Sequence, residues 1–396
     1  MKKLFFVLAF LIPLIIHAQT IKTDVLVIGK SDAAFAAGLQ AGKSGVKTTV
    51  LTQGDGFDLI NFENNRTYIE NIFFVKMRKV MRVPNNQKLA EPTKQTLNVV
   101  IKAIEDSLKT FTILNELSAM QIEKSGNGWE VKLNDGKIIK SKTLIITEFL
   151  ENIFKKSKIA PPMAAQSNLL TYDDNKYRTT IGALNPQAPL QYISLYNLIT
   201  PNIDNLIYTT NNSLKIGQIA GATAAYATFF KKNTSESNLK QIQSRLLNNK
   251  LSLLPLDDLR EDDPNWLDIQ KVGITGILKA DIKNGKAFFS PEKEVTYDEI
   301  KQPLKDYYYK AQIWFDDHQS SPINLESTIS MVCYVGNKAI DATKTEIEKK
   351  WKKNYRFSSK YDLKKVLTRR EFSVIINEYL RPFDDVNVDR TGQVIR

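Results

Sequence analysis

Residues 23–53 constrain the fold more than any other part of the chain, because they read as a strand, a tight turn, a helix and a second strand. Residues 25–28 form the short apolar, β-branched run typical of a buried strand, and Gly29 offers the backbone freedom that a sharp strand-to-helix turn needs. Small residues between Ala33 and Gly42 would let the helix press against the sheet, and residues 48–51 read as the next strand. The sequence therefore predicts an α/β protein with a Rossmann-like start.

The glycine fingerprint of such a start, G-x-G-x-x-G, is altered. Its three positions are Gly29, Ser31 and Ala34. The second glycine normally lets the backbone approach a pyrophosphate, so Ser31 adds a side chain at that point, whereas Ala34 is an accepted substitute. The acidic residue that would bind a ribose hydroxyl at the end of the second strand is replaced by Thr52.

Two interpretations of this segment stay open. Asp32 lies at the start of the predicted helix, where its carboxylate would cap the helix in place of a phosphate. Lys30 beside it would attract an anion. The unit is therefore either a nucleotide site or an ordinary βα unit that binds nothing.

The first 18 residues are predicted to be a secretory signal peptide. Two lysines precede an apolar run interrupted by Pro13, and the small residue Ala18 ends it, which is the pattern of a cleaved leader. We therefore expect an exported protein, periplasmic or secreted, that is not integral to the membrane after cleavage. Cys333 is the only cysteine of the 396 residues, so no internal disulfide can form.

Charge and histidine content narrow the function further. The net charge is +12, and the lysines are scattered, which favours a solvated or anionic-polymer-facing surface over a nucleic-acid site. The only histidines are His17 and His318, which excludes a Ser/His/Asp triad or a multi-histidine metal site after leader cleavage. The acidic residues between 257 and 263 suit either a linker or a calcium site, and residues 316–318 either a solvated loop or a metal site.

The middle of the chain predicts strands that return to the first sheet. Residues 111–147 show short alternating runs with turns at 126–128 and 134–136, which indicates a β-meander that ends in a buried strand at 143–147. Residues 151–177 look irregular. A strand is expected within 205–210, followed by a helix over 216–230 that is rich in small residues.

This order of elements resembles the secreted bacterial FAD-dependent oxidoreductases, more narrowly the exported group called xanthan-lyase-like. The resemblance covers residues 19–235 as an FAD/NAD(P)-binding-like domain and rests on the first βαβ unit and on the GQIAGATAA helix. It implies FAD as cofactor, with its pyrophosphate at the first helix and its isoalloxazine facing the closing helix. The implied flavin contacts are Gly29, Ser31, Ala34, Thr52, Gly217 and Gln218.

Departures from the family pattern leave a second interpretation open. The strand at 143–147 ends in Thr147, Glu148 and Phe149, where the family has a small-residue turn with glycine, and the family's glycine is missing after Tyr208. The chain is therefore either a reduced FAD-dependent oxidoreductase or a non-catalytic relative, a pseudoenzyme that binds envelope glycan or polysaccharide.

The carboxy-terminal part predicts two mainly α repeats, at 252–312 and 325–385. Each repeat carries a T-x-x-E capping box, at residues 296–299 and 368–371, and the second contains a helical stretch over residues 333–340. The repeats resemble S-layer-homology modules, whose T-R-x-E-F element is matched by Thr368, Arg369, Glu371 and Phe372. The resemblance implies attachment to envelope glycan, and the alternative is a pair of helical packing modules.

Overall fold

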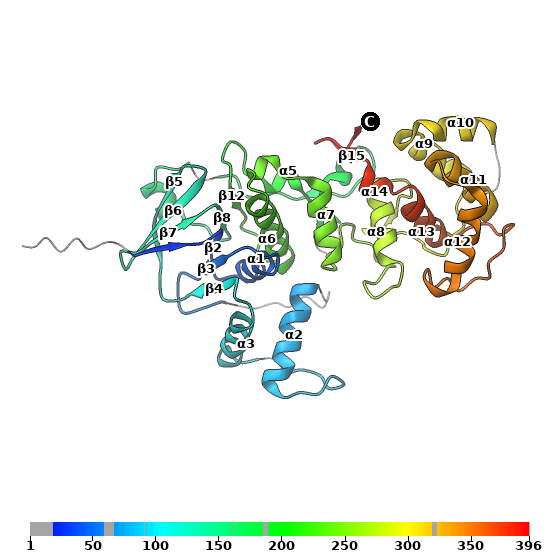
Figure 1. Ribbon diagram of the computed structural model, residues 1–396. Coiled ribbons are helices and arrows are strands. Elements are labelled where there is room, and N and C mark those ends of the chain that lie inside the picture. Colours follow the sequence, from blue (N-terminus) through cyan, green and yellow to red (C-terminus); the bar gives the residue numbers. More distant parts are fainter. Residues whose placement is uncertain are drawn as a thin grey trace, which may run out of the picture.

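A five-stranded parallel sheet forms the centre of the amino-terminal part of the chain (Figure 1). The computed structural model describes residues 19–58, 67–90, 92–160, 162–184, 189–318 and 323–395, so the expected signal peptide lies outside the described residues. The spatial order of the strands is β12-β8-β2-β3-β4, and every neighbouring pair is parallel. In chain order this is the 3-2-1-4-5 arrangement of a Rossmann-like sheet, which confirms the predicted fold class. The strands are β2 (Val25–Ile28), β3 (Thr48–Leu51), β4 (Phe111–Leu114), β8 (Thr143–Ile146) and β12 (Leu206–Tyr208).

Two helices of small residues cover one face of this sheet. They are α1 (Asp32–Lys43) and α6 (Leu214–Phe229), which pack closely against each other. A Cβ added to Gly38 of α1 would lie 2.3 Å from Cγ2 of Val50 in β3, so the small residues are required by the close approach of helix and sheet.

The predicted meander covers the opposite face. Trp129 and Val131 of the meander pack with Leu26 and Ile28 of β2 in a second hydrophobic core. Strand β1 extends the meander sheet by pairing in parallel with β7. The strands of this sheet are β1 (Thr20–Lys22), β5 (Ala119–Ser125), β6 (Gly128–Leu133) and β7 (Ile138–Ser141).

Residues 151–177 were expected to be irregular, and this is wrong in part. The short helix α4 (Glu151–Lys156) lies in this stretch, as does strand β9 (Asn168–Leu169). Phe154 is 1% exposed, and its ring packs edge-on against Tyr208 at a centroid distance of 5.8 Å. Burial of this one aromatic side chain holds a helix that has weak local signals.

Most of the smaller elements are insertions between strands of the parallel sheet. Helices α2 and α3 lie between β3 and β4 in the chain and are seen at the bottom of Figure 1. A three-stranded antiparallel sheet, in the order β10-β11-β9, is formed by residues between β8 and β12. The elements not yet given are α2 (Tyr68–Met81), α3 (Lys94–Asp106), β10 (Thr180–Leu184), β11 (Gln191–Ser194), α5 (Leu195–Leu198) and the 3₁₀ helices η1 (Lys176–Thr179) and η2 (Thr234–Glu236).

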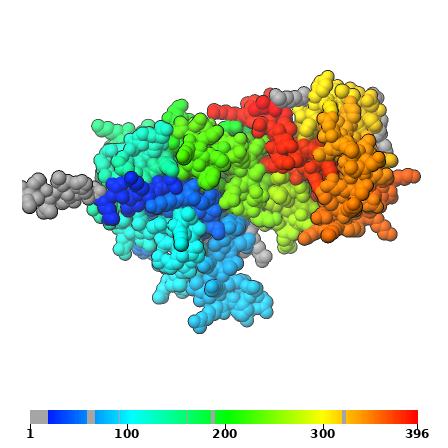
Figure 2. All heavy atoms as spheres, viewed as in Figure 1, coloured from blue at the N-terminus to red at the C-terminus, as the bar shows by residue number. Residues whose placement is uncertain are grey.

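The carboxy-terminal part is mainly helical and forms the other end of an elongated molecule (Figures 1 and 2). Its apolar side chains are continuous with those of α1 and α6 in one hydrophobic core. Among the described residues, no helix is both long and apolar enough to cross a bilayer. The elements are α7 (Leu239–Asn248), α8 (Trp266–Thr275), β13 (Asp281–Lys283), β14 (Lys286–Phe288), α9 (Tyr297–Tyr307), α10 (Tyr309–Asp317), α11 (Leu325–Gly336), α12 (Ile340–Lys353), α13 (Arg369–Tyr379), α14 (Pro382–Asp385), β15 (Asn387–Val388) and β16 (Val394–Ile395).

Candidate functional site

The candidate site is the switch point at the carboxyl ends of β2 and β8, where the strand order of the sheet reverses, and we call this region the crevice. Ligands of open α/β sheets bind at such a switch point. Gly29 follows β2 with φ of +144°, and a Cβ added there would lie 2.0 Å from Oγ1 of Thr147, the residue that follows β8. The turn therefore requires glycine, as the sequence predicted.

The first turn of α1 is capped by Ser31, a predicted site residue. Its hydroxyl accepts a hydrogen bond from the backbone amide of Ala34 at 3.4 Å. The expectation that Asp32 caps this helix is therefore wrong, because Ser31 holds the cap position and Asp32 is the first residue of the helix. Ala34, also a predicted site residue, is fully buried beneath the turn.

A carboxylate of the protein occupies the turn that would face a pyrophosphate. The backbone amide of Lys30 donates a hydrogen bond to Oε1 of Glu148 at 2.6 Å. The ammonium of Lys30 pairs with Asp58, with 2.6 Å between Nζ and Oδ2. Partial burial raises the pKa of Glu148, and the nearby charge of Asp58 acts in the same direction, while the amide and ammonium of Lys30 oppose the shift.

These residues do not fit a dinucleotide pyrophosphate. A pyrophosphate bound at a helix start needs free backbone amides and a positive local field. Here the Lys30 amide is taken by Glu148 and the Lys30 ammonium by Asp58, and the carboxylate of Asp32 lies in the first turn of α1. Bringing a pyrophosphate to this point would place like charges together and displace Glu148.

Thr52 lies at the end of β3, as predicted, but its hydroxyl bonds within the chain. The side chain is fully buried, and Oγ1 lies 3.0 Å from Oδ1 of Asn115 and 3.1 Å from the carbonyl oxygen of Gly54. The hydroxyl therefore stabilises the turn after β3. Threonine has no carboxylate that could bind a ribose hydroxyl.

The two predicted contacts on α6 lie inside the protein. A Cβ added to Gly217 would lie 2.1 Å from the carbonyl oxygen of Ala33, so this glycine is required by the packing of α6 on α1. Gln218 is fully buried, and neither its amide nitrogen nor its amide oxygen has a hydrogen-bond partner among the residues that the structure describes. A buried polar group without a partner is uncommon and is costly in free energy.

The structure thus brings Gly29, Ser31 and Ala34 together at the crevice, whereas Thr52 lies at the end of the neighbouring strand and Gly217 between two helices. Sequence reasoning did not assign Glu148 a role in the site. The available signal was its position, since an acidic residue at the end of a central parallel strand faces the switch point.

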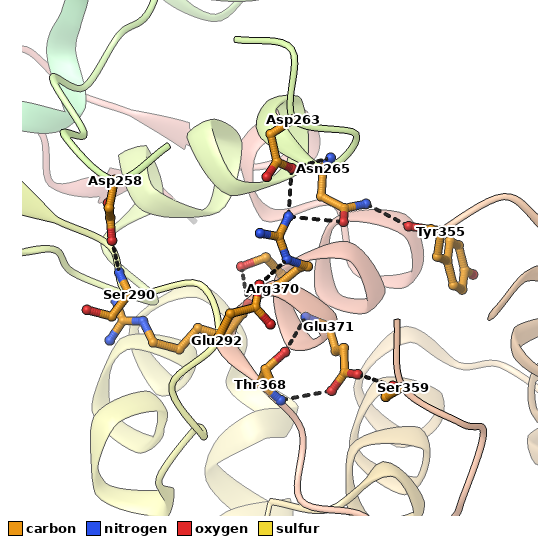
Figure 3. A network of polar contacts seen from close by, with 12 residues as sticks. Asp258, Asp263, Asn265, Ser290, Glu292, Tyr355, Ser359, Thr368, Arg370 and Glu371 are labelled. Atoms are coloured by element: carbon orange, nitrogen blue, oxygen red, sulfur yellow. Dashed lines mark hydrogen bonds and ion pairs between the residues drawn. The ribbon is translucent and has the colours of Figure 1, made fainter. Parts of the chain in front are cut away.

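Thr368, Arg370 and Glu371 of the T-R-R-E-F element, in the second predicted repeat, lie in a network of polar contacts (Figure 3). Thr368 and Glu371 form the predicted capping box at the start of α13, and Thr296 and Glu299 form the other at the start of α9. Arg369 is 2% exposed and pairs with Glu299, so the second box is bonded directly to the first.

Two carboxylates of the acidic run at residues 257–263 form contacts within the carboxy-terminal part of the chain. Asp263 pairs with Arg370 at 2.6 Å, and Asp258 accepts hydrogen bonds from the amides of Phe289 and Ser290 (Figure 3). Within the described part of the chain, no group of three or more histidine, cysteine, aspartate or glutamate side chains could hold a metal ion.

Comparison with known proteins yields partial structural likenesses alone. No family model and no curated protein matches the chain. The solved structures that overlap with it include bacillithiol disulfide reductase from Staphylococcus aureus (14% identity, 33% of this chain and 39% of that one, TM-score 0.23). A thioredoxin reductase from T. acidophilum (18%, 32% and 34%, 0.20) and the flavin-dependent monooxygenase PieE in complex with FAD and substrate (13%, 37% and 34%, 0.27) also overlap.

The chain therefore spans well under half the length of each of these structures. Overlaps of this size carry no assignment of activity, and the fold class rests on the strand order of the parallel sheet.

Proposed function

We propose that this chain is a non-catalytic member of the FAD-dependent oxidoreductase-like fold whose dinucleotide site is closed by its own side chains. The hydrogen bond from the Lys30 amide to Glu148 carries the proposal. It takes up the backbone donor that this fold otherwise offers to a phosphate. The ion pair between Lys30 and Asp58 supports it, because it neutralises the one cation of the turn.

The proposal includes export. The first 18 residues support a cleaved leader, and a periplasmic or secreted protein would then carry this fold to the envelope. The narrower kinship, to the xanthan-lyase-like group, rests on the residues of the first βαβ unit and of α6.

The helical carboxy-terminal part is proposed to bind envelope glycan or polysaccharide, as S-layer-homology modules do. Arg369 is not the contact, because it is buried in the pair with Glu299. A surface pocket of about 450 Å³ between α10 and α11 is the better candidate. The ring of His318 stacks on that of Trp314 there, with 4.4 Å between the centroids, and Tyr334 is 44% exposed. An exposed aromatic face beside amide and carboxylate groups suits a sugar ring.

One observation favours a second function, that of an FAD-binding oxidoreductase. Gln218 lies near the start of α6, the helix that would face the flavin in this resemblance, and its buried amide has no partner among the described residues. A flavin bound after a rearrangement of the crevice would supply one. The flavin would then carry out the redox chemistry, and the protein would bind and orient it.

The visible absorption spectrum of the purified protein, followed by melting with added FAD, tests the proposal. We expect a colourless protein whose melting temperature does not respond to FAD. Binding with FAD at about 100 times its Kd would stabilise the folded state by about 2.7 kcal/mol, which is readily measured. A yellow protein, or stabilisation that saturates with FAD, would overturn the proposal in favour of the oxidoreductase.

A further inference from the structure

A second cavity opens at the amino-terminal edge of the parallel sheet, at the opposite end of the strands from the crevice. It has a volume of about 680 Å³ and lies where β2, β3 and β8 begin and α6 ends, under the turn between β5 and β6. We call it the lysine cavity. Its basic lining residues are Lys22, Lys47, Lys140, Lys142, Lys231 and Lys232.

The positive charge of the lysine cavity is largely uncompensated. Asp24 is the only carboxylate among the described residues that line it, and Asp24 pairs with Lys142 at 2.8 Å. Lys140 pairs with Glu130 at 2.7 Å. The other four lysines form no ion pair with any residue of the described ranges. Like charges gathered in one hollow repel each other, so a bound anion would relieve that repulsion.

A buried hydroxyl in the same cavity also lacks a partner. Ser141 is 6% exposed and lines the cavity, and its hydroxyl makes no hydrogen bond to any residue that the structure describes. The surroundings are fixed, because Thr143 and Thr228 share a hydrogen bond of 3.0 Å and a Cβ on Gly128 would lie 2.3 Å from the carbonyl oxygen of Ser141. An oxyanion in the cavity would accept the hydrogen bond that Ser141 can donate.

We propose that the lysine cavity binds a small polyanion that carries two or more adjacent phosphate groups. A lysine ammonium group is a mobile point charge, unlike the planar guanidinium of arginine. Lysines therefore select for density of negative charge more than for the shape of the ligand. Four lysines without carboxylate partners match a ligand with several charges better than a single phosphate. The site is independent of the flavin crevice, because it lies at the other edge of the sheet.

The test uses inorganic tripolyphosphate and inorganic phosphate, titrated calorimetrically into the full-length purified protein at low and high salt. We expect tripolyphosphate to bind at least about tenfold more tightly than phosphate, and the affinity to fall as salt screens the charges. Equal affinities, or no binding of tripolyphosphate at low salt, would overturn the proposal.

Matched variants distinguish the cavity from the general charge of the protein. The double variant Lys47→Gln/Lys231→Gln removes two cavity charges, and Lys349→Gln/Lys353→Gln removes two exposed charges on α12. We expect the first to weaken tripolyphosphate binding by about tenfold or more and the second by less than about twofold. Equal losses would mean non-specific attraction and would contradict the site.

Two further variants keep this test decisive. If the first double variant melts at a lower temperature than the wild type, Lys22→Gln/Lys232→Gln is used in its place. We expect the same weakening of tripolyphosphate binding. Ser141→Ala should weaken binding by about tenfold while the salt dependence stays unchanged, because it removes a hydrogen bond and no charge. Unchanged affinity in Ser141→Ala would contradict the proposed hydrogen bond from the Ser141 hydroxyl to the bound anion.

Discussion

Glu148 accepts a hydrogen bond from the backbone amide of Lys30 at 2.6 Å, across the point where the strand order of the sheet reverses. In a dinucleotide-binding fold this amide belongs to the turn that receives a phosphate. Glu148 lies two residues after β8, where the family resemblance implies a small residue, and its carboxylate takes the donor that a phosphate would need. The proposed function follows from this contact, since the chain would keep the architecture without binding a dinucleotide.

Glu148→Gln should change how stability depends on pH. Burial raises the pKa of Glu148 in the folded protein above its ordinary value of 4.5. Between that value and the raised pKa the folded state binds more protons than the unfolded state, so wild-type stability falls as pH rises through this window. Glutamine does not titrate and can still accept from the Lys30 amide.

Urea unfolding of both proteins at several pH values between about 4.5 and 7.5 checks this. We expect the stability difference to shift in favour of Glu148→Gln as the pH rises. A constant difference would show that folding leaves the pKa of Glu148 unchanged, and a shift in favour of the wild type would show that the folded state stabilises the carboxylate as an anion. Either result would contradict the raised pKa.

Gln218→Met should stabilise the protein. The amide of Gln218 is fully buried with no partner among the described residues, so replacing it with an apolar side chain of similar size removes a cost of about 1–3 kcal/mol. Gln243→Met is the matched control, because Gln243 is equally buried but donates to the carbonyl oxygens of Arg178 and Thr180. Chemical denaturation should show a gain for the first and a loss for the second, and a loss for both would mean that Gln218 is bonded in solution.

Gly217→Ala should destabilise the protein through helix packing. The added methyl group would lie 2.1 Å from the carbonyl oxygen of Ala33, so α1 and α6 must separate, at a cost of about 1–3 kcal/mol. Gly54→Ala is the control, since no atom lies within 4 Å of the added methyl group. Thermal melting should distinguish the two variants, and equal melting temperatures would contradict the close contact.

Arg369 should be coupled to Glu299. Removing either partner leaves a mostly buried charge, so we expect Arg369→Met to cost about 3–5 kcal/mol and the double variant with Glu299→Gln to lose less than the sum of the single changes. Arg260→Met, which breaks an exposed pair with Asp262, should cost less than about 1 kcal/mol. Additive losses in the double-mutant cycle would contradict a direct pair between Arg369 and Glu299.

The sequence predicted those parts of the fold that have strong local signals. Strands β2 and β3, the meander, the small-residue helix α6 and both capping boxes were all predicted from periodicity, turn residues and caps. The helical stretch over residues 333–340 was wrong, because Asn337 adopts a left-handed conformation with φ of 51° and separates α11 from α12. Asparagine adopts this conformation more readily than most residues, so the pair Gly336 and Asn337 was the available signal for a helix end.

The site was harder to predict because it depends on long-range contacts. Glu148 and Lys30 are 118 residues apart, so no local pattern joins them. Gly217 was interpreted as a flavin contact, yet its contact with Ala33 depends on how two helices cross. The exchange of Ser31 for Asp32 as helix cap is a shift of one residue, which is the ordinary uncertainty of helix ends.

Calorimetric titration of FAD into the wild type and into Glu148→Gly, side by side, tests the closed crevice most directly. We expect no saturable binding to the wild type below about 0.1 mM and at least about tenfold tighter binding to the variant, in which the Lys30 amide is free. Saturation of the wild type at micromolar FAD would contradict the account, and so would a variant whose affinity for FAD equals that of the wild type.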